Sequence, residues 1–251
     1  MKVGCLLIHG WTGSSFEMEP FVEPLEADGV VVRNIMLPGH GTTFEDFQTT
    51  GWSDWEWAAE KEYAALAEQV DAVFVVGISM GGTLALHVAS KFPVAGVVSL
   101  AAPLYLYSLF PWQMKDWRIP FTPIIKHLKP VFPLGRRDET HIKIAPWEGY
   151  DEFVSLQQLH ELMNGVKKVR REVNAITAPI LIVQAPTDRS VPLGNVFLLA
   201  KSVSSKDVTI KLLRIEEKVT GHHIITTHVE TSEKIVQLVR EFIKTHFYTK
   251  M

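Results

Sequence analysis

The stretch from Asp71 to Ser90 constrains the fold of this chain more than any other part of the sequence. It opens with a run of apolar, mostly β-branched residues, 72–76, which is typical of a strand buried on both faces. It closes with Met80, Leu84 and Val88 at helical spacing, which predicts a helix packed on a sheet. The stretch therefore predicts one strand–turn–helix unit of an α/β fold.

The turn inside this unit has the sequence Gly77-Ile78-Ser79-Met80-Gly81, a G-x-S-x-G pattern. A serine on so sharp a turn is held in a strained backbone conformation, with its hydroxyl directed out of the fold. Small residues are needed beside it because a side chain there would strike the adjoining strand or helix. A serine N-cap at a tight turn is the alternative interpretation. The position between a buried strand and an amphipathic helix favours a nucleophile at Ser79.

Composition limits the classes of protein that are compatible with this chain. Its 251 residues are 47% hydrophobic and 21% charged, enough for one large α/β domain or a domain that carries a cap. A formal net charge of -3 without a long basic run argues against nucleic acid as a partner. The one cysteine, Cys5, lies in an apolar strand, so the sequence contains no disulfide framework.

The start of the chain, MKVGCLLIHG, has too short an apolar run for a signal peptide. No other apolar segment approaches the length of a transmembrane helix. We therefore expect a cytoplasmic protein without stable membrane insertion. Nothing in the sequence distinguishes a monomer from a homodimer.

Strand and helix patterns alternate along most of the chain. Strands are predicted at residues 3–8, 30–36, 72–76, 96–101, 179–185 and 208–213. Capping-box patterns at 14–17, 53–56 and 227–230 predict helix starts, and further helices are expected at about 153–173 and after Pro192. Strands separated by helices predict a mostly parallel sheet with helices on both faces.

The sequence changes character after Pro103. Up to about Pro133 it is rich in proline and aromatic residues and has no sustained period, and up to about Gly149 it does not form another strand–helix unit. We therefore predict a core of residues 1–102 and 150–251 and a cap insertion of residues 103–149. Its aromatic side chains either face a groove over Ser79 or pack the cap onto the core. They are Tyr105, Tyr107, Phe110, Trp112, Trp117, Phe121 and Phe132.

Two further groups of reactive side chains follow strands of the predicted sheet. Asp188 comes shortly after the fifth strand, and Gly221-His222-His223 follows the sixth. In a parallel sheet, ligands gather at the carboxyl ends of the strands. A serine becomes a good nucleophile when a histidine takes its proton and a carboxylate orients that histidine. The order Ser, Asp, His favours such a triad, while an Asx turn at Asp188 and a polar loop at the histidines are the alternatives.

Together these motifs resemble the α/β-hydrolase superfamily, in particular its bacterial carboxylesterase and monoacylglycerol-lipase branch. The matching segments span nearly the whole predicted core in the right order, and only the insertion after Pro103 has no motif to match. The segments are His9-Gly10-Trp11-Thr12-Gly13, Leu37-Pro38-Gly39-His40-Gly41, Trp52 with Trp55, Gly77-Ile78-Ser79-Met80-Gly81-Gly82, Pro186-Thr187-Asp188-Arg189-Ser190-Val191-Pro192 and His223-Ile224-Ile225-Thr226.

The resemblance implies an α/β-hydrolase fold in which Ser79 is the nucleophile and Asp188 the acid of a triad. The base is a histidine at 222 or 223: the apolar pair and threonine that follow select His223, whereas a Gly-His arrangement would select His222. The oxyanion hole is assigned to the backbone N–H groups of Trp11 and Met80. Structural roles are expected for the other two motif histidines, His9 and His40.

The resemblance also implies a serine carboxylic-ester hydrolase that uses no metal and no cofactor and works through an acyl-enzyme. An apolar cap over the serine predicts short-to-medium acyl esters or monoacylglycerols as substrates. The same scaffold serves thioesters, C–C bonds, peptides and perhydrolysis, so these chemistries stay as alternatives. A non-catalytic receptor for a small apolar ligand and a membrane-surface lipase are further hypotheses.

Overall fold

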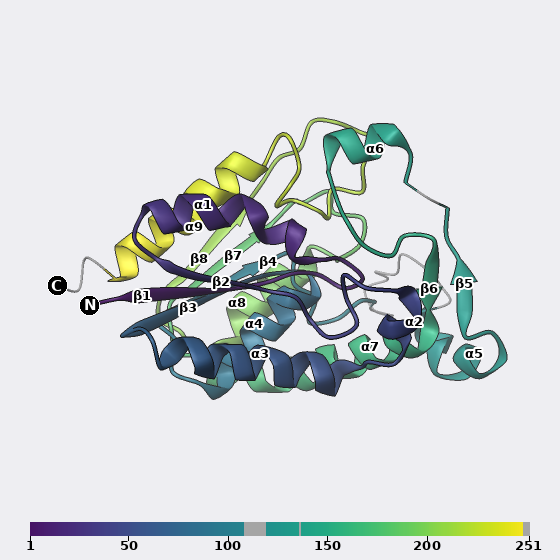
Figure 1. Cartoon of the computed structure of the whole chain (residues 1–251), viewed down its shortest axis with the longest axis horizontal. Coiled ribbons are helices and arrows are strands. Elements are labelled where there is room, and N and C mark those ends of the chain that lie inside the picture. The colour runs from purple at the N-terminus through teal and green to yellow at the C-terminus, as the bar shows by residue number, and fades with distance from the viewer. Residues whose placement is uncertain (108–118, 136, 248–251) are drawn as a thin grey trace.

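A six-stranded parallel sheet forms the centre of the protein (Figure 1). The computed structural model describes residues 1–107, 119–135 and 137–247. Within them the strand order is β2-β1-β3-β4-β7-β8, and every pairing in this sheet is parallel. The strands are β1 (Val3–Ile8), β2 (Val31–Ile35), β3 (Ala72–Ile78), β4 (Gly96–Leu100), β7 (Ile180–Gln184) and β8 (Val208–Leu212). The predicted sheet is confirmed, with small shifts at the strand ends.

Helices cover both faces of the sheet (Figure 1). Two of them, α1 (Glu19–Ala27) and α9 (Ser232–Phe247), pack on one face. The opposite face is covered by α3 (Trp52–Ala67), α4 (Met80–Lys91), α7 (Leu156–Glu172) and α8 (Gly194–Ser202). Among the helices of the described residues, none has the length and apolar composition needed to cross a bilayer.

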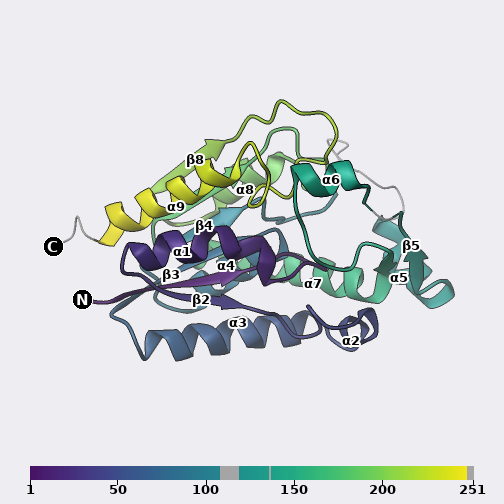
Figure 2. The same cartoon turned by 45° about the horizontal axis from the view of Figure 1, so that its top comes forward.

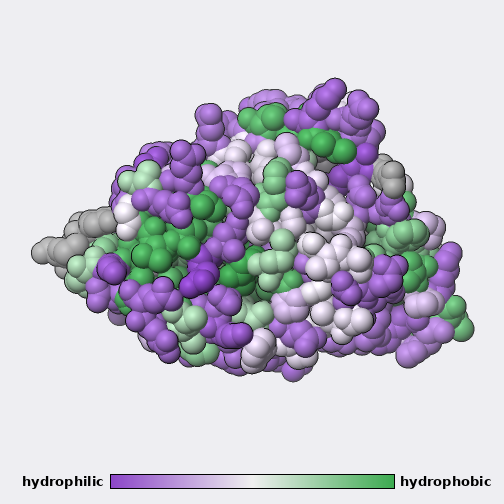
Figure 3. All heavy atoms as spheres, in the orientation of Figure 1, coloured by the Kyte–Doolittle hydropathy of each residue, from purple (hydrophilic) through white to green (hydrophobic). Residues whose placement is uncertain are grey.

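The position of each strand in the sheet explains its sequence. The four central strands are buried along almost their whole length because each has a helical layer on both faces, which is why they read as continuous apolar runs. The edge strands β2 and β8 are partly exposed. Figure 3 shows hydrophobic side chains gathered over the edge at β2, where Val31 is 36% exposed.

The first predicted capping box is wrong in its second half. Ser14 does cap a short 3-10 helix, η1 (Ser15–Met18), by accepting the N–H of Phe16. Glu17 does not turn back to the N-cap but is buried and accepts the N–H of Gly10. The carboxylate therefore binds the loop after β1, although its spacing from Ser14 predicts a hydrogen bond at the start of the helix.

The other two predicted capping boxes are also wrong in their residues. Helix α3 begins earlier, at Trp52, where the Asp54 side chain accepts the N–H of the N-cap residue Gly51. Helix α9 begins at Ser232, beyond the predicted box, because Glu230 accepts the N–H groups of Glu216 and Glu217 in the preceding loop. The S/T-x-x-E pattern is short, so it also occurs at places where the glutamate accepts N–H groups from another part of the chain and does not cap a helix.

The described residues of the segment 103–149 form elements outside the main sheet. They are η2 (Ile119–Phe121), α5 (Thr122–Leu128), β5 (Val131–Pro133) and α6 (Glu139–Ile144). Strand β5 pairs antiparallel with β6 (Phe153–Ser155), so the helix predicted from residue 153 starts only at Leu156. Figures 1 and 2 show these elements beyond the carboxyl ends of the parallel strands. The predicted cap aromatics Phe110, Trp112 and Trp117 lie outside the described residues.

Candidate active site

Ser79 occupies the sharp turn between β3 and α4. Its backbone has φ 54 and ψ -121, a region that residues with a side chain rarely adopt. A Cβ on Gly77 would lie 2.1 Å from the carbonyl oxygen of Gly81, and a Cβ on Gly81 would lie 2.2 Å from that of Ile8. The turn thus requires both glycines of the motif. Ser79 is the N-cap residue of α4, as the alternative interpretation has it, but its side chain accepts no N–H of the helix, so capping does not explain the serine hydroxyl.

The side chains of Ser79, His223 and Asp188 form one continuous chain of contacts. His223 Nε2 lies 2.9 Å from Ser79 Oγ, and His223 Nδ1 lies 2.8 Å from Asp188 Oδ2. The three residues follow β3, β8 and β7, at the same edge of the sheet. The Asp188 side chain is 1% exposed and that of His223 is 18% exposed, so the aspartate is shielded while the imidazole can reach a ligand.

Asp188 uses its two carboxylate oxygens for different purposes. Oδ1 accepts the N–H groups of Ser190 at 2.6 Å and Val191 at 2.9 Å. Oδ2 contacts His223, with the side-chain amide of Gln184 at 3.5 Å. The Asx turn, which is the alternative interpretation, therefore coexists with the contact to His223. The turn holds the carboxylate in the orientation that His223 needs.

His222 points into a different environment from His223. Its Nδ1 lies 2.6 Å from Thr187 Oγ1, and its Nε2 lies 2.9 Å from the carbonyl oxygen of Glu217. Both ring nitrogens are therefore occupied away from Ser79. The geometry favours the choice of His223 over His222 as the base.

Backbone strain is concentrated around this edge of the sheet. Four non-glycine residues of the described chain have positive φ: Thr12 at 60, Ser79 at 54, Ala101 at 48 and His222 at 55. Each lies in a segment that follows a strand of the main sheet. Such conformations persist where the surrounding structure holds them, and they are typical of functional sites.

The surroundings of His223 set its proton affinity. Burial lowers the pKa of His223, but the charge of Asp188 and its hydrogen bond outweigh this effect and raise the pKa above its ordinary value of 6.5. The imidazolium that would form on taking a proton from Ser79 is thereby stabilised. Burial lowers the pKa of His9 to about 3 and that of His40 to about 4, which keeps both rings neutral.

His9 has a structural role, as predicted. Its Nε2 accepts the N–H of Leu37 at 3.1 Å, and its Nδ1 lies 2.9 Å from the carbonyl oxygen of Gly10. It therefore joins the loop after β1 to the loop after β2. His40 similarly contacts the carbonyl oxygen of Pro38 at 3.0 Å.

The two predicted oxyanion donors flank the serine. Met80 is the first residue of α4, where N–H groups have no partner within the helix. Trp11 follows Gly10, and a Cβ on Gly10 would lie 3.3 Å from the Cβ of Ser79, so this loop runs directly past the nucleophile. Within the described chain neither N–H donates to another group. Both are available for a ligand oxygen.

Glu17 is the residue of the site that sequence reasoning missed. It lies against the loop of residues 9–13, is 3% exposed and accepts the N–H of Gly10 at 2.7 Å. Its spacing from Ser14 matches a capping box, and no local pattern distinguishes such a glutamate from a buried one. Only the proximity of η1 to the loop after β1 reveals it.

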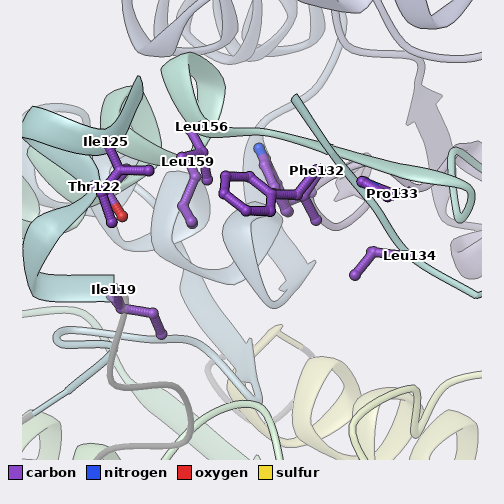
Figure 4. A pocket seen from close by; sticks show the side chains of 10 residues that line it. Ile119, Thr122, Ile125, Phe132, Pro133, Leu134, Leu156 and Leu159 are labelled. Carbon is purple, nitrogen blue, oxygen red and sulfur yellow. The ribbon is translucent and has the colours of Figure 1, made fainter. Parts of the chain in front are cut away.

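An apolar cavity of about 190 Å³ lies between the loop of residues 9–13 and the elements outside the main sheet. Figure 4 shows that its labelled side chains come from η2, α5, β5, the following Leu134 and α7. None of the described lining residues is charged. They are Trp11, Ile119, Thr122, Ile125, Phe132, Pro133, Leu134, Val154, Leu156 and Leu159. Of the predicted cap aromatics, Phe132 therefore faces a cavity, whereas Phe121 is 50% exposed.

One cluster of the described residues resembles a metal site in composition. Glu56, Glu60 and His87 bring potential ligand atoms within 4.8 Å of one another. Lys91 lies 3.0 Å from Glu60 Oε1, and Lys168 contacts Glu56. The two ammonium groups neutralise the carboxylates, so this cluster is an ion-pair network between α3, α4 and α7.

Comparison with known proteins gives consistent matches over most of the chain. The model of a family described as serine aminopeptidase, S33, matches residues 1–215. A thermostable monoacylglycerol lipase from Bacillus sp. (strain H-257) is 29% identical over 245 residues, 97% of this chain and 91% of that protein. A carboxylesterase from Bacillus subtilis (strain 168) is 24% identical over 242 residues, 95% of this chain and 91% of that protein.

A solved structure agrees with these matches. It comes from work on LipS and LipT, two metagenome-derived lipolytic enzymes, and superposes with a TM-score of 0.81 at 25% identity. The superposition covers 98% of this chain and 94% of that one. The similarity therefore includes the elements outside the main sheet as well as the sheet and its helices.

Proposed function

The chain belongs to the family described as serine aminopeptidase, S33, and from that premise we propose that it is a serine carboxylic-ester hydrolase acting through an acyl-enzyme. The observation that carries this proposal is the unbroken series of contacts from Ser79 through His223 to Asp188. Hydroxyl, imidazole and carboxylate at these distances are the arrangement in which a serine can be deprotonated as it attacks.

The reaction follows from the contacts of each group. Ser79 Oγ attacks the ester carbonyl carbon while His223 Nε2 takes its proton, and Asp188 stabilises the imidazolium. The Trp11 and Met80 N–H groups bind the oxygen that becomes negative. Collapse of this intermediate breaks the bond to the alcohol, which takes the proton from His223. Water then attacks the acyl-enzyme while His223 takes its proton, and the acid leaves as its bond to Ser79 Oγ breaks and Oγ takes the proton from His223.

The apolar cavity supports short-to-medium acyl esters or monoacylglycerols as the substrates. Two relatives are named monoacylglycerol lipase and carboxylesterase, whereas the family description names an aminopeptidase. An aminopeptidase substrate carries a protonated amine, which a carboxylate would bind. No described residue that lines the cavity has a carboxylate. We therefore place an acyl chain there, with residues 103–149 acting as a cap.

Three further parts of the proposal follow the sequence. The chemistry is completed by protein groups, and we propose no metal or cofactor for it. A cytoplasmic location remains our proposal, which a single buried cysteine without a disulfide partner in the sequence supports. A homodimer is the third part, and the mass of the protein in solution tests it.

Labelling with a fluorophosphonate tests the nucleophile. We expect one adduct, located by mass spectrometry at Ser79, because the activated hydroxyl attacks the electrophilic phosphorus as it would an ester carbonyl. Ser79→Ala should take up no label, while Ser99→Ala, which removes a buried serine of β4, should be labelled like the wild type. A wild-type enzyme that hydrolyses esters without being labelled would exclude this mechanism.

A series of esters with increasing acyl length tests the cavity. Each buried methylene contributes about 0.8 kcal/mol, so kcat/KM should rise by about 4-fold per carbon until the cavity is full. Ile125→Trp should move the optimum to shorter chains because Ile125 lines the cavity. Its neighbour Ile124 is 65% exposed, and Ile124→Trp should leave the optimum in place. The same acyl groups offered as thioesters and amides test the alternative chemistries.

Equal shifts of the optimal acyl length in both tryptophan variants would show that the acyl chain does not bind in this cavity. A wild-type enzyme that prefers thioesters or peptides over the matched esters would replace the proposed substrate class. The triad would then serve another of the chemistries compatible with the fold.

A further inference from the structure

Glu17 packs into the loop that carries the Trp11 N–H. Its Oε2 accepts the Gly10 N–H at 2.7 Å. A Cβ on Gly13 would lie 2.3 Å from the same oxygen, and a Cβ on Gly10 would lie 3.1 Å from it. The carboxyl is therefore enclosed by the two glycines of the loop, and Gly10 lies between this carboxyl and Ser79.

The Trp11 N–H belongs to the planar peptide unit that begins with the Gly10 carbonyl. This carbonyl oxygen accepts the N–H of Gly13 at 3.3 Å and lies 2.9 Å from His9 Nδ1. Glu17 binds the Gly10 N–H, which belongs to the preceding peptide unit, and the carbonyl oxygen of Thr12 accepts the N–H of Tyr150 at 2.9 Å. Gly10 is therefore held on both of its peptide units, and Glu17 acts on the Trp11 N–H through the backbone of Gly10.

Charged groups of the site face the same carboxyl. His223 and Arg137 are close enough to influence Glu17 electrostatically, and the Trp147 indole N–H hydrogen-bonds to it. The Arg137 guanidinium in turn stacks 4.0 Å from the Trp147 ring. Burial raises the pKa of Glu17 to about 7 although each of these groups acts in the opposite direction. The charge of Glu17 also raises the pKa of His223.

We propose that Glu17 is a positioning residue for the reaction: its buried carboxyl holds the loop of residues 9–13 against Ser79. This inference rests on the proposed function. An oxyanion hole is effective when its donors are fixed before the negative charge forms. Glu17 contributes to that fixation for Trp11 through the Gly10 N–H, whereas Met80 is fixed by its place at the start of α4.

Two substitutions test this hydrogen bond. Glu17→Leu removes it, and we expect kcat to fall by about 100-fold with KM changed little, because a displaced donor acts mainly on the transition state. Glu17→Gln keeps an oxygen that can accept the Gly10 N–H and should retain most of kcat. Glu19→Gln, at an exposed position of the same segment, is the matched control and should match the wild type in kcat and KM.

The stability of the same variants provides an independent readout. Because the pKa of Glu17 rises from 4.5 to about 7, its contribution to stability is full below pH 4.5 and is lost as the pH rises to about 7. Glu17→Gln should remove this part of the pH dependence of the denaturation midpoint. The near-isosteric variant keeps the test valid if the leucine variant does not fold.

A Glu17→Leu enzyme with wild-type kcat, or a Glu17→Gln enzyme that loses as much kcat as Glu17→Leu, would overturn the inference. Loss of stability in both variants with unchanged kinetics would also overturn it, since it would leave only a structural role. If one of these outcomes were found and the wild type was labelled and hydrolysed esters, the proposed function would stand. Only the positioning role of Glu17 would then be refuted. If the wild type neither hydrolysed esters nor took up label, the proposed function itself would fail.

Discussion

Replacing His223 with alanine is expected to lower kcat for ester hydrolysis by about 10⁶-fold, the scale seen when a triad histidine is removed from a serine hydrolase. The reason is that Ser79 Oγ has its hydrogen-bond partner for proton transfer in His223 Nε2, at 2.9 Å. The remaining rate would come from the oxyanion hole and from substrate binding. Steady-state kinetics on a short acyl ester, with thermal unfolding to verify the fold, measure this effect.

His222 provides the matched control for that experiment. Its ring contacts Thr187 and Glu217 instead of the serine, and its backbone has φ 55. Asparagine tolerates this conformation better than most residues, so His222→Asn should preserve the loop. We expect it to retain kcat within about 10-fold, because the residue takes no part in proton transfer. An inactive His222→Asn enzyme beside an active His223→Ala enzyme would reverse the assignment of the base.

Replacing Asp188 with asparagine is expected to lower kcat by about 10⁴-fold. An amide can present an N–H to His223 Nδ1, which favours the wrong tautomer of the imidazole, and it supplies no charge to stabilise the imidazolium. The carboxylate also raises the pKa of His223. A histidine base loses activity as the pH falls through its pKa, so the residual activity should extend to lower pH than that of the wild type.

The control for this substitution is Asp46→Asn, at an exposed position of α2 (Phe44–Gln48), which should leave both kcat and the pH profile unchanged. The measurement is kcat as a function of pH for both variants and the wild type. An Asp188→Asn enzyme within about 10-fold of wild-type kcat would show that the carboxylate is not the orienting group. Its Oδ1 contacts with Ser190 and Val191 would then define a structural turn only.

Features with a strict local requirement were predictable from the sequence. The turn at Ser79 is one: a Cβ at Gly77 or Gly81 would meet backbone atoms closer than 2.5 Å, at 2.1 and 2.2 Å, so few other residues can stand there. The sheet is another, because strands covered by helices on both faces must be apolar throughout. Asp188 was predictable because an aspartate suits both the turn with Ser190 and Val191 and the contact with His223.

Features that depend on a distant partner were not predictable in the same way. Phe153 begins a strand because β5 is available to pair with it, although its sequence continues the helical period of α7. Glu17 and Glu230 match capping boxes, yet each accepts N–H groups from another part of the chain. A carboxylate can accept a backbone N–H of its own helix or one from a distant segment equally well. The spacing of the glutamate in the sequence therefore does not distinguish the two.

The sequence by itself determined the order of strands and helices, the strained serine turn and the residue types at the ends of three strands. The tertiary structure decided which of two adjacent histidines faces Ser79, since the positive φ of His222 turns the two rings toward different neighbours. It also decided that Glu17 belongs to the site. Both outcomes depend on directions in space, which residue spacing along a chain does not specify once the chain leaves a regular helix or strand.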